Sequence, residues 1–121
     1  MKVLLGLGQG SDAASVLERT AERTVAAGDD LTVAIGGPGS LASVEELEAR
    51  ARETLAEFDL DASVRIVEGD LGSRLVELAE QGGFDRIVLD GGDRSPMGKI
   101  TISSTVEFVL LNARTSVTLL R

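Results

Sequence analysis

Residues 85–121 read DRIVLDGGDRSPMGKITISSTVEFVLLNARTSVTLLR. This stretch predicts a buried strand at Asp85–Leu89, a polar Gly-rich loop at Asp90–Thr101, a helix that opens at Ser103, and a final apolar strand at Ser116–Leu120. A Gly-rich loop between a strand end and a helix start often holds a phosphate, because backbone N–H groups and the helix dipole converge on an anion there. The stretch therefore predicts one side of an α/β sheet with a candidate anion site.

Three strand-like runs precede this stretch: Val3–Leu7, Leu31–Ile35 and Ala62–Val67. Apolar residues at helical spacing fill the segments between strands, which gives the order β-α-β-α-β-α-β-α-β. Gly-rich loops follow the first, second and fourth strands, and they converge only if the first and fourth strands are neighbours. The sequence therefore predicts a single domain over residues 1–121. It is a three-layer α/β/α sandwich of the Rossmann-like type, with a five-stranded parallel sheet in the order 3-2-1-4-5.

Capping residues and glycines mark the predicted ends of the helices. Ser43–Glu46 and Ser104–Glu107 have the spacing of capping boxes, and Asp70 is a predicted N-cap of the third helix. Gly28 and Gly83 stand where helices commonly end. The residues at inward-facing positions include Val25, Leu41 and Leu110. Charged residues on the other faces of the second helix are expected to face solvent: Glu45, Glu48, Arg52 and Glu53.

The composition excludes several function classes. The chain has no cysteine and no histidine, which removes disulfides, thiolate nucleophiles, Cys/His zinc sites and Ser-His-Asp triads. The formal net charge is −8, with ten Arg and two Lys, so there is no basic stripe for nucleic acid. No apolar run approaches the roughly 20 residues that span a bilayer, so no membrane segment is expected.

The composition also bears on where the protein works. The absence of cysteine and of a signal-peptide pattern fits a cytoplasmic location. An excess of acidic residues with scarce lysine suits either a halophilic, high-salt setting or an ordinary acidic domain.

Two glycine motifs resemble known nucleotide-binding signatures only in part. Residues Gly8–Ala13 fit the G-x-G-x-x-G/A pattern, but two glycines stand where a ribose-binding acidic residue is needed at the end of the second strand. Gly98 and Lys99 match the end of a P-loop, but Asp93 replaces its first glycine and Ile100 its Ser/Thr. Neither motif predicts its usual ligand, and a tight strand-to-helix turn explains the glycines of the first loop.

Four segments together resemble the universal stress protein family, whose domain covers essentially the whole chain. Val3–Asp12 is similar to the family's opening strand and turn, and Val67–Asp70 to its lead into the third helix. Arg94–Lys99 and Ser103–Glu107, with the final apolar strand, resemble its C-terminal block, which is the most specific part. The resemblance implies an adenine-nucleotide α-hydrolase-like fold, with ATP or AMP and Mg²⁺ as the ligands if the site is retained.

This chain departs from the family's nucleotide-binding motif, which is G-x-x-G, nine residues and then G-[ST]. Asp90, Asp93 and Ser103 stand at the three glycine positions, and Ser104 matches the Ser/Thr position. Each carboxylate crowds the approach of phosphate to the backbone and adds a repulsion of about 1 kcal/mol if it is wet. The resemblance implies this nucleotide-binding set, if binding is retained: Gly8, Gln9, Gly10, Ser11, Ile35, Gly36, Asp90, Asp93, Arg94, Lys99, Ser103, Ser104 and Thr105.

Asp90 and Asp93 leave three interpretations open. They serve turn chemistry, which Asp favours in such loops. Alternatively they hold Mg²⁺, for which carboxylate oxygens are suitable ligands, while Arg94 and Lys99 offset further charge. In the third interpretation the loop binds another anion.

These observations lead to three hypotheses of function. The leading one is a non-enzymatic, universal-stress-type cytoplasmic protein of the stress response. Its ATP/AMP binding is expected to be weak or lost, and the absence of a bound cofactor is favoured over ATP or AMP with Mg²⁺. The first alternative is a Mg-dependent ATP-binding protein with slow hydrolysis, in which Asp90 or Asp93 holds the metal and Ser104 and Lys99 contact phosphates. The second is a dimeric module that binds another protein.

The final strand predicts self-association. An apolar strand at a sheet edge exposes unpaired backbone groups and invites pairing with another chain. The resemblance implies a homodimer through this strand, with Val117 and Leu119 in the interface. The alternative is a monomer whose edge is shielded by Arg114 and Arg121.

Overall fold

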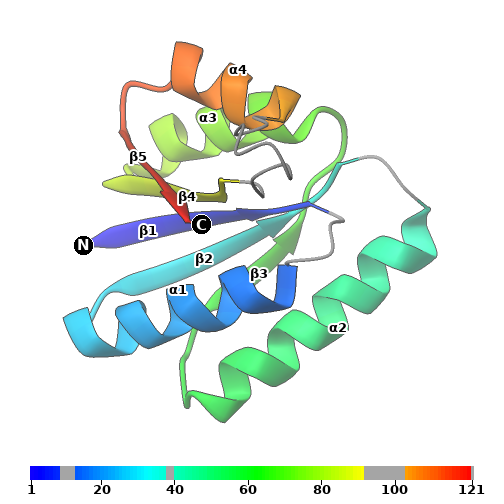
Figure 1. The fold of residues 1–121 in the computed structure, drawn as a ribbon, viewed down its shortest axis with the longest axis vertical. Coiled ribbons are helices and arrows are strands. Elements are labelled where there is room, and N and C mark those ends of the chain that lie inside the picture. The colour runs from blue at the N-terminus through cyan, green and yellow to red at the C-terminus, as the bar shows by residue number, and fades with distance from the viewer. Residues whose placement is uncertain (9–12, 38–39, 92–102, 121) are drawn as a thin grey trace, which may run out of the picture.

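The computed structural model describes residues 1–8, 13–37, 40–91 and 103–120. Its five-stranded parallel sheet has the order β3-β2-β1-β4-β5, and helices connect successive strands (Figure 1). The strands are β1 Lys2–Leu7, β2 Asp30–Ile35, β3 Ser63–Ile66, β4 Arg86–Asp90 and β5 Ser116–Leu120. The helices are α1 Ala13–Ala27, α2 Leu41–Glu57, α3 Leu71–Gly82 and α4 Ser104–Asn112. The predicted fold class and sheet order are confirmed.

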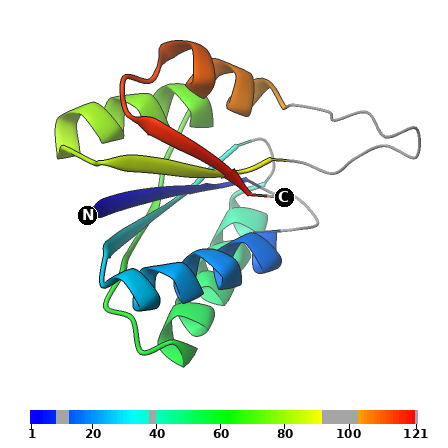
Figure 2. The same ribbon diagram turned by 60° about the vertical axis from the view of Figure 1, so that its left-hand side comes forward.

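The sheet lies between two helical layers, with α1 and α2 on one face and α3 and α4 on the other (Figure 2). Because successive side chains of a strand point to opposite faces, β1 supplies both layers. Val3, Leu5 and Leu7 pack in the α1/α2 layer, whereas Leu4 packs in the α3/α4 layer. All four side chains are buried, which explains why this central strand is an uninterrupted apolar run.

Gly6 sets how closely α3 approaches the sheet. A Cβ atom at this position would lie 2.5 Å from Cδ1 of Leu75 on α3 and 2.8 Å from Cδ2 of Leu89 on β4. Carbon atoms pack at about 3.5–4.0 Å, so a larger residue would push the two leucines away. Gly6, the next-to-last residue of β1, is therefore a packing residue.

The two outer strands differ as the sequence predicts. In β3, Ser63 and Arg65 are exposed while Val64 and Ile66 are half-buried against the α1/α2 layer. In β5, Val117 and Leu119 pack partly buried against the α3/α4 layer, and Leu120 is buried on the other face. Both strands lie at sheet edges, β3 beside β2 and β5 beside β4.

Two helix starts differ from their predictions. The N-cap of α2 is Ser40, whose side chain accepts a hydrogen bond from the Ser43 backbone N–H at 3.1 Å, so the predicted box at Ser43 is wrong. The N-cap of α4 is Ser103, one residue before the predicted Ser104, and its Oγ accepts from the Val106 N–H at 3.2 Å. In both cases an earlier serine satisfies the free N–H three residues on.

The other predicted caps are confirmed. Asp70 caps α3, and Gly83 ends it in the left-handed conformation with a φ of 64°. Gly28 follows α1 with a φ of 69°, and its N–H donates to the Thr24 carbonyl at 2.9 Å. Glycine adopts this conformation without the steric cost that a Cβ adds.

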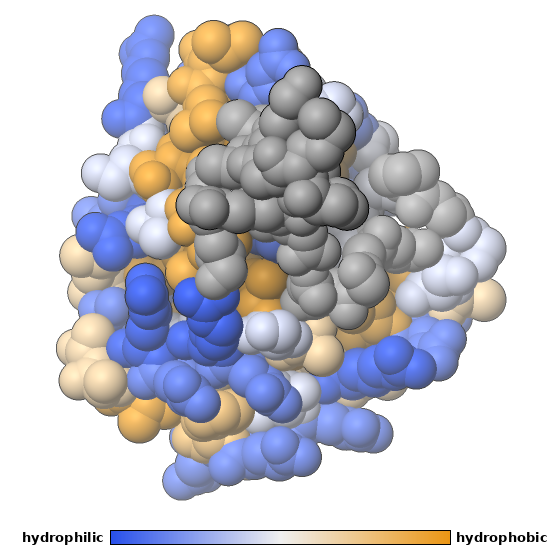
Figure 3. Space-filling view, in the orientation of Figure 1, coloured by the Kyte–Doolittle hydropathy of each residue, from blue (hydrophilic) through white to orange (hydrophobic). Residues whose placement is uncertain are grey.

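Three residues predicted to face inward are exposed. Val25 is 52% exposed, Leu110 46%, and Leu41, the first residue of α2, 68%. In α4 the apolar residues surround the helix, so periodicity alone could not select the buried face. Val106 and Val109 form that face, whereas Leu110 and Leu111 remain exposed. Figure 3 shows apolar side chains gathered over the α4 end of the molecule.

Candidate functional site

The carboxyl ends of the parallel strands meet at one edge of the sheet and bring several predicted site residues together. The Gly36 N–H donates to the Leu7 carbonyl at 3.1 Å, which joins the ends of β1 and β2. The Val67 N–H donates to the Ile35 carbonyl at 2.8 Å, which adds the segment leading into α3. Gly8, Ile35 and Gly36 therefore lie at the edge where ligands bind in sheets of this kind.

Gly36 allows the end of β2 to pack against the segment before α3. A Cβ at Gly36 would lie 2.8 Å from Cγ2 of Val67 and 3.0 Å from the Val67 carbonyl oxygen. At Gly8 the nearest atoms are Leu71 Cδ2 at 3.8 Å and the Gly36 carbonyl oxygen at 3.9 Å, which are ordinary contacts. Packing thus requires glycine at Gly36 but not at Gly8, where it leaves the backbone open to a close approach.

The two helices of the α3/α4 layer present different N-termini to this edge. At α3, the Asp70 carboxylate accepts hydrogen bonds from the Ser73 N–H and the Ser73 hydroxyl, both at 2.9 Å. These two bonds lower the pKa of Asp70, because they favour its charged form. The N-terminus of α3 is therefore already occupied by a negative group.

At α4 the cap is neutral. The Ser103 hydroxyl satisfies the Val106 N–H, and the described residues supply no hydrogen-bond partner for the N–H groups of Ser104 and Thr105. Ser104 is exposed and Thr105 is half-buried in this first turn. Free N–H groups and the positive end of the helix dipole favour an anion, so the N-terminus of α4 is better suited than that of α3 to bind a phosphate.

Asp90 is the last residue of β4, and its side chain is partly buried at the same edge. It stands one residue before Gly91, whose N–H donates to the Leu120 carbonyl and joins β4 to β5. The other predicted loop residues lie outside the described residues: Gln9, Gly10, Ser11, Asp93, Arg94 and Lys99. The predicted Asp90–Asp93 metal pair is therefore not placed, and the described ranges contain no group of three or more Asp or Glu side chains that could hold a metal ion.

The sequence predicts Asp70 only as a helix cap, whereas it is also a charged group at the carboxyl edge of the sheet. Its position after the third strand was the available signal, because the topology carries every strand's carboxyl end to that edge. Among the described residues, Asp90 and the Asp70 cap make this edge more acidic than a plain glycine loop.

Comparison with solved structures places this architecture among known folds. The universal stress protein from Archaeoglobus fulgidus superposes with a TM-score of 0.78 at 22% identity, over 100% of this chain and 98% of that chain. A universal stress protein in complex with cAMP gives a TM-score of 0.81 at 20% identity, over 100% of this chain and 96% of that chain.

The chain has the universal stress protein fold. A plant protein of this fold, from Arabidopsis thaliana with AMP bound, superposes with a TM-score of 0.71 at 14% identity, over 99% of this chain and 90% of that chain. No protein-family model matches the sequence, and no curated protein matches it significantly. The likeness is therefore carried by the backbone architecture across the whole length of the universal stress protein domain.

In the described part of the chain, no helix is both long enough and apolar enough to cross a membrane.

Proposed function

We propose that this chain is a universal-stress-type protein whose carboxyl-edge site binds an adenine nucleotide weakly. The observation that carries the proposal is the pairing of a retained architecture with an altered charge at its ligand edge. Proteins of the same fold are described in complex with cAMP and with AMP. Here Gly8 keeps the backbone accessible, and Gly36 lets the end of β2 pack closely at the same edge. The described residues leave the N–H groups of Ser104 and Thr105 at the start of α4 without a hydrogen-bond partner.

The weakness follows from carboxylates near the expected phosphates. Asp90 ends β4 at this edge, and Asp93 follows three residues later in the sequence. Each adds a repulsion of about 1 kcal/mol toward a phosphate if it is wet. A nucleotide with more phosphate charge suffers more, so AMP is expected to bind more tightly than ATP in the absence of a divalent cation.

Calorimetric titration tests this proposal. AMP, ATP and ATP with Mg²⁺ are titrated in turn, and the proposal expects a Kd in the range of about 0.1–1 mM for AMP, equivalent to a binding free energy of roughly −5.5 to −4 kcal/mol. Micromolar binding of any of the three would show that the acidic residues do not weaken the site. Tightening only with Mg²⁺ would favour the Mg-dependent alternative.

We further propose that the protein is non-enzymatic. Without histidine or cysteine, proton transfer to a leaving group would depend on carboxylates, hydroxyls, Lys or Arg. Phosphate release from ATP and Mg²⁺ should equal the uncatalysed background. Release above background that disappears in Asp90→Ala would instead support slow hydrolysis.

The outer edge of β5 supports a homodimer as part of the same proposal. The Gly91 N–H donates to the Leu120 carbonyl, so Leu120 points its backbone groups at β4. The backbone N–H and C=O groups of successive residues point to alternate sides of a strand. Those of Thr118 therefore also point toward β4, whereas those of Val117 and Leu119 point outward, away from β4. The described residues provide no hydrogen-bond partner for these outward groups.

An antiparallel pair of β5 strands centred on Thr118 would satisfy these groups. Val117 of one copy would then lie opposite Leu119 of the other, with hydrogen bonds in both directions. The exposed Leu110 and Leu111 of α4 lie on the same layer and would extend the contact beyond the strands. The interface would thus combine strand addition with an apolar helix surface.

The variant Val117→Pro tests this dimer with little harm to the monomer. It removes an outward N–H and leaves the ladder to β4 intact, whereas Val117→Ala keeps the N–H and loses similar packing. Sedimentation should give a dimer for wild type and Val117→Ala, and a monomer for Val117→Pro. A dimer that persists in Val117→Pro would show that pairing occurs elsewhere.

A further inference from the structure

The other edge of the sheet is treated differently from the β5 edge. The Val67 N–H donates to the Ile35 carbonyl of β2. Because backbone N–H and C=O groups point to alternate sides along a strand, those of Val64 and Ile66 in β3 point outward, away from β2. The outward Val64 carbonyl accepts a hydrogen bond from Nη2 of Arg52 at 3.3 Å. A side chain thus occupies a position that an added strand would use.

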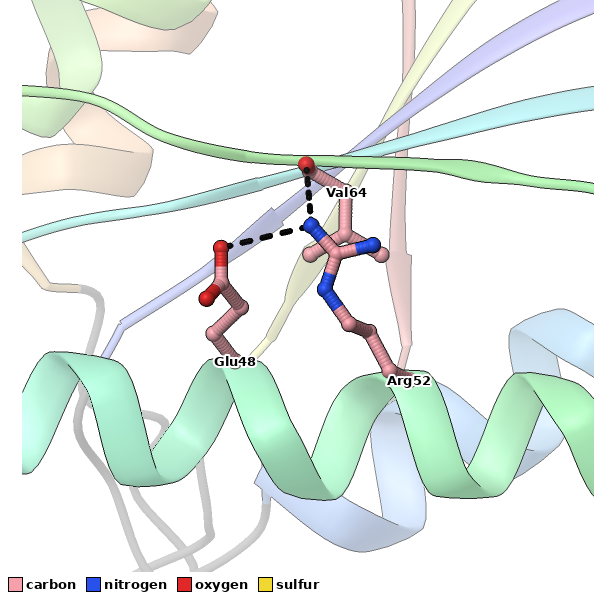
Figure 4. Close-up of polar contacts among 3 residues, drawn as sticks. All are labelled: Glu48, Arg52 and Val64. Carbon is pink, nitrogen blue, oxygen red and sulfur yellow. Dashed lines mark hydrogen bonds and ion pairs between the residues drawn. The ribbon is translucent and has the colours of Figure 1, made fainter.

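Figure 4 shows how this contact is held. Arg52 lies on α2 and reaches across to the strand, while the Glu48 carboxylate, one turn earlier on the same helix, lies 3.5 Å from the same nitrogen. Glu48 is only 28% exposed and Arg52 is 57% exposed, so the ion pair lies along the helix margin and its outer side meets water. The pair aims a positively charged donor at the strand's backbone acceptor.

This arrangement matters because a sheet with two open edges can assemble without limit. A chain that pairs through one edge alone makes a closed two-fold dimer. A chain that pairs through both edges adds copies at each end and makes an open-ended fibre. Charged side chains at an edge are a known means of preventing such pairing.

We propose that Arg52 blocks the β3 edge against strand addition by a second copy of this chain. The guanidinium fills the hydrogen-bonding position at Val64 and would leave an incoming strand with an unpaired N–H and a nearby charge to desolvate. Self-association is thereby confined to β5. The expectation that loss of Arg52 gives open-ended fibres rests on the proposed β5 dimer. The proposed block at β3 does not depend on that dimer.

Arg52→Ala is the test, and Arg50→Ala is its matched control. Arg50 lies on the same helix and pairs with Glu46 at 2.9 Å, also four residues apart, but it donates no described hydrogen bond to the sheet. Both variants lose the same charge and the same ion-pair type. Only Arg52→Ala uncovers the Val64 carbonyl.

The measurement is the weight-average mass by sedimentation over a hundredfold range of protein concentration. Arg52→Ala should exceed the wild-type mass at least twofold at the highest concentration, while Arg50→Ala should follow wild type. Equal masses for Arg52→Ala and wild type, with unchanged circular dichroism, would overturn the proposal.

A second background separates this proposal from the β5 dimer. In Val117→Pro, the additional change Arg52→Ala should convert a monomer into a dimer through β3. If wild type is already monomeric, the β5 proposal fails, yet Arg52→Ala should still raise the mass. If Arg52→Ala unfolds, Arg52→Gln keeps a long side chain without the charge and should raise the mass by a smaller factor; no increase there would overturn the block.

Discussion

The substitution Gly6→Ala tests the close packing of α3 against the sheet. The new Cβ would lie 2.5 Å from Leu75 Cδ1 and 2.8 Å from Leu89 Cδ2, about 1 Å inside normal contact. The two contacted atoms end flexible side chains, but Leu75 and Leu89 are 0% and 2% exposed, so their methyl groups would have to displace other core atoms. Overpacking of this kind costs about 1–3 kcal/mol.

A smaller opposing effect reduces that cost. Replacing glycine by alanine restricts the unfolded chain and stabilises the native state by about 0.4–1 kcal/mol where the backbone is compatible. The net expectation is a loss of about 1–2 kcal/mol in the free energy of unfolding. With a urea dependence of about 2 kcal/mol per molar, the unfolding midpoint should fall by roughly 0.5–1 M.

Gly8→Ala is the control for this measurement. Its Cβ would meet no atom of the described residues closer than 3.8 Å, so the unfolding midpoint should stay level or rise slightly. A Gly6→Ala midpoint equal to that of wild type would show that α3 moves away without cost, and would refute the assignment of Gly6 as a packing residue.

Two further predictions concern the helix caps. Ser103→Ala should lower the free energy of unfolding, measured by urea titration, by about 1 kcal/mol, because the Val106 N–H loses its acceptor. Ser104→Ala, at the exposed first position of the helix, should change it little. Equal losses in the two variants would show that Ser103 is not the cap. Asp70 has a lowered pKa in the folded state, so it stabilises above the unfolded pKa near 3.8, and that stability is lost as pH falls through the folded pKa. Thermal unfolding of Asp70→Asn should therefore depend less on pH below about 4 than that of wild type, and parallel curves would contradict the role of the Ser73 bonds.

The sheet order could be predicted from the sequence because of where its glycines fall. Loops after β1, β2 and β4 carry them, and only one arrangement of parallel strands brings these three ends together. The edge position of β3 was also readable, since Ser63 and Arg65 interrupt an otherwise apolar strand. Strong local patterns here coincide with the global fold.

Details that depend on one residue of register were less accessible. Ser40 and Ser43, like Ser103 and Ser104, offer two serines near one helix start, and the sequence does not say which hydroxyl reaches the free N–H. Arg52 was predicted only as a charge that faces solvent. Its hydrogen bond to the Val64 carbonyl depends on how α2 packs on β3, which the sequence pattern does not specify. Contacts between elements of this kind leave no periodic signal in the chain.

The sequence predicted which residues stand at the candidate site, but not the contacts that they make. Gly36 was identified as a site residue from its place after β2, but its contact with the Val67 backbone appears only in three dimensions. Asp90 was predicted as the first residue of the loop, whereas it is the last residue of β4. The roles of Asp90 and Asp93 toward phosphate remain predictions, because they concern a ligand rather than the fold.

Calorimetric titration of AMP into wild type and into the double variant Asp90→Gly/Asp93→Gly tests the central claim most directly. Removing two carboxylates, each at about 1 kcal/mol of repulsion, should recover about 2 kcal/mol, which corresponds to roughly thirtyfold tighter binding. Wild type should bind weakly and the double variant more tightly, with the same heat-unfolding cooperativity in both. Tight binding by wild type, or unchanged weak binding by the double variant, would contradict the claim that these two residues weaken a retained nucleotide site.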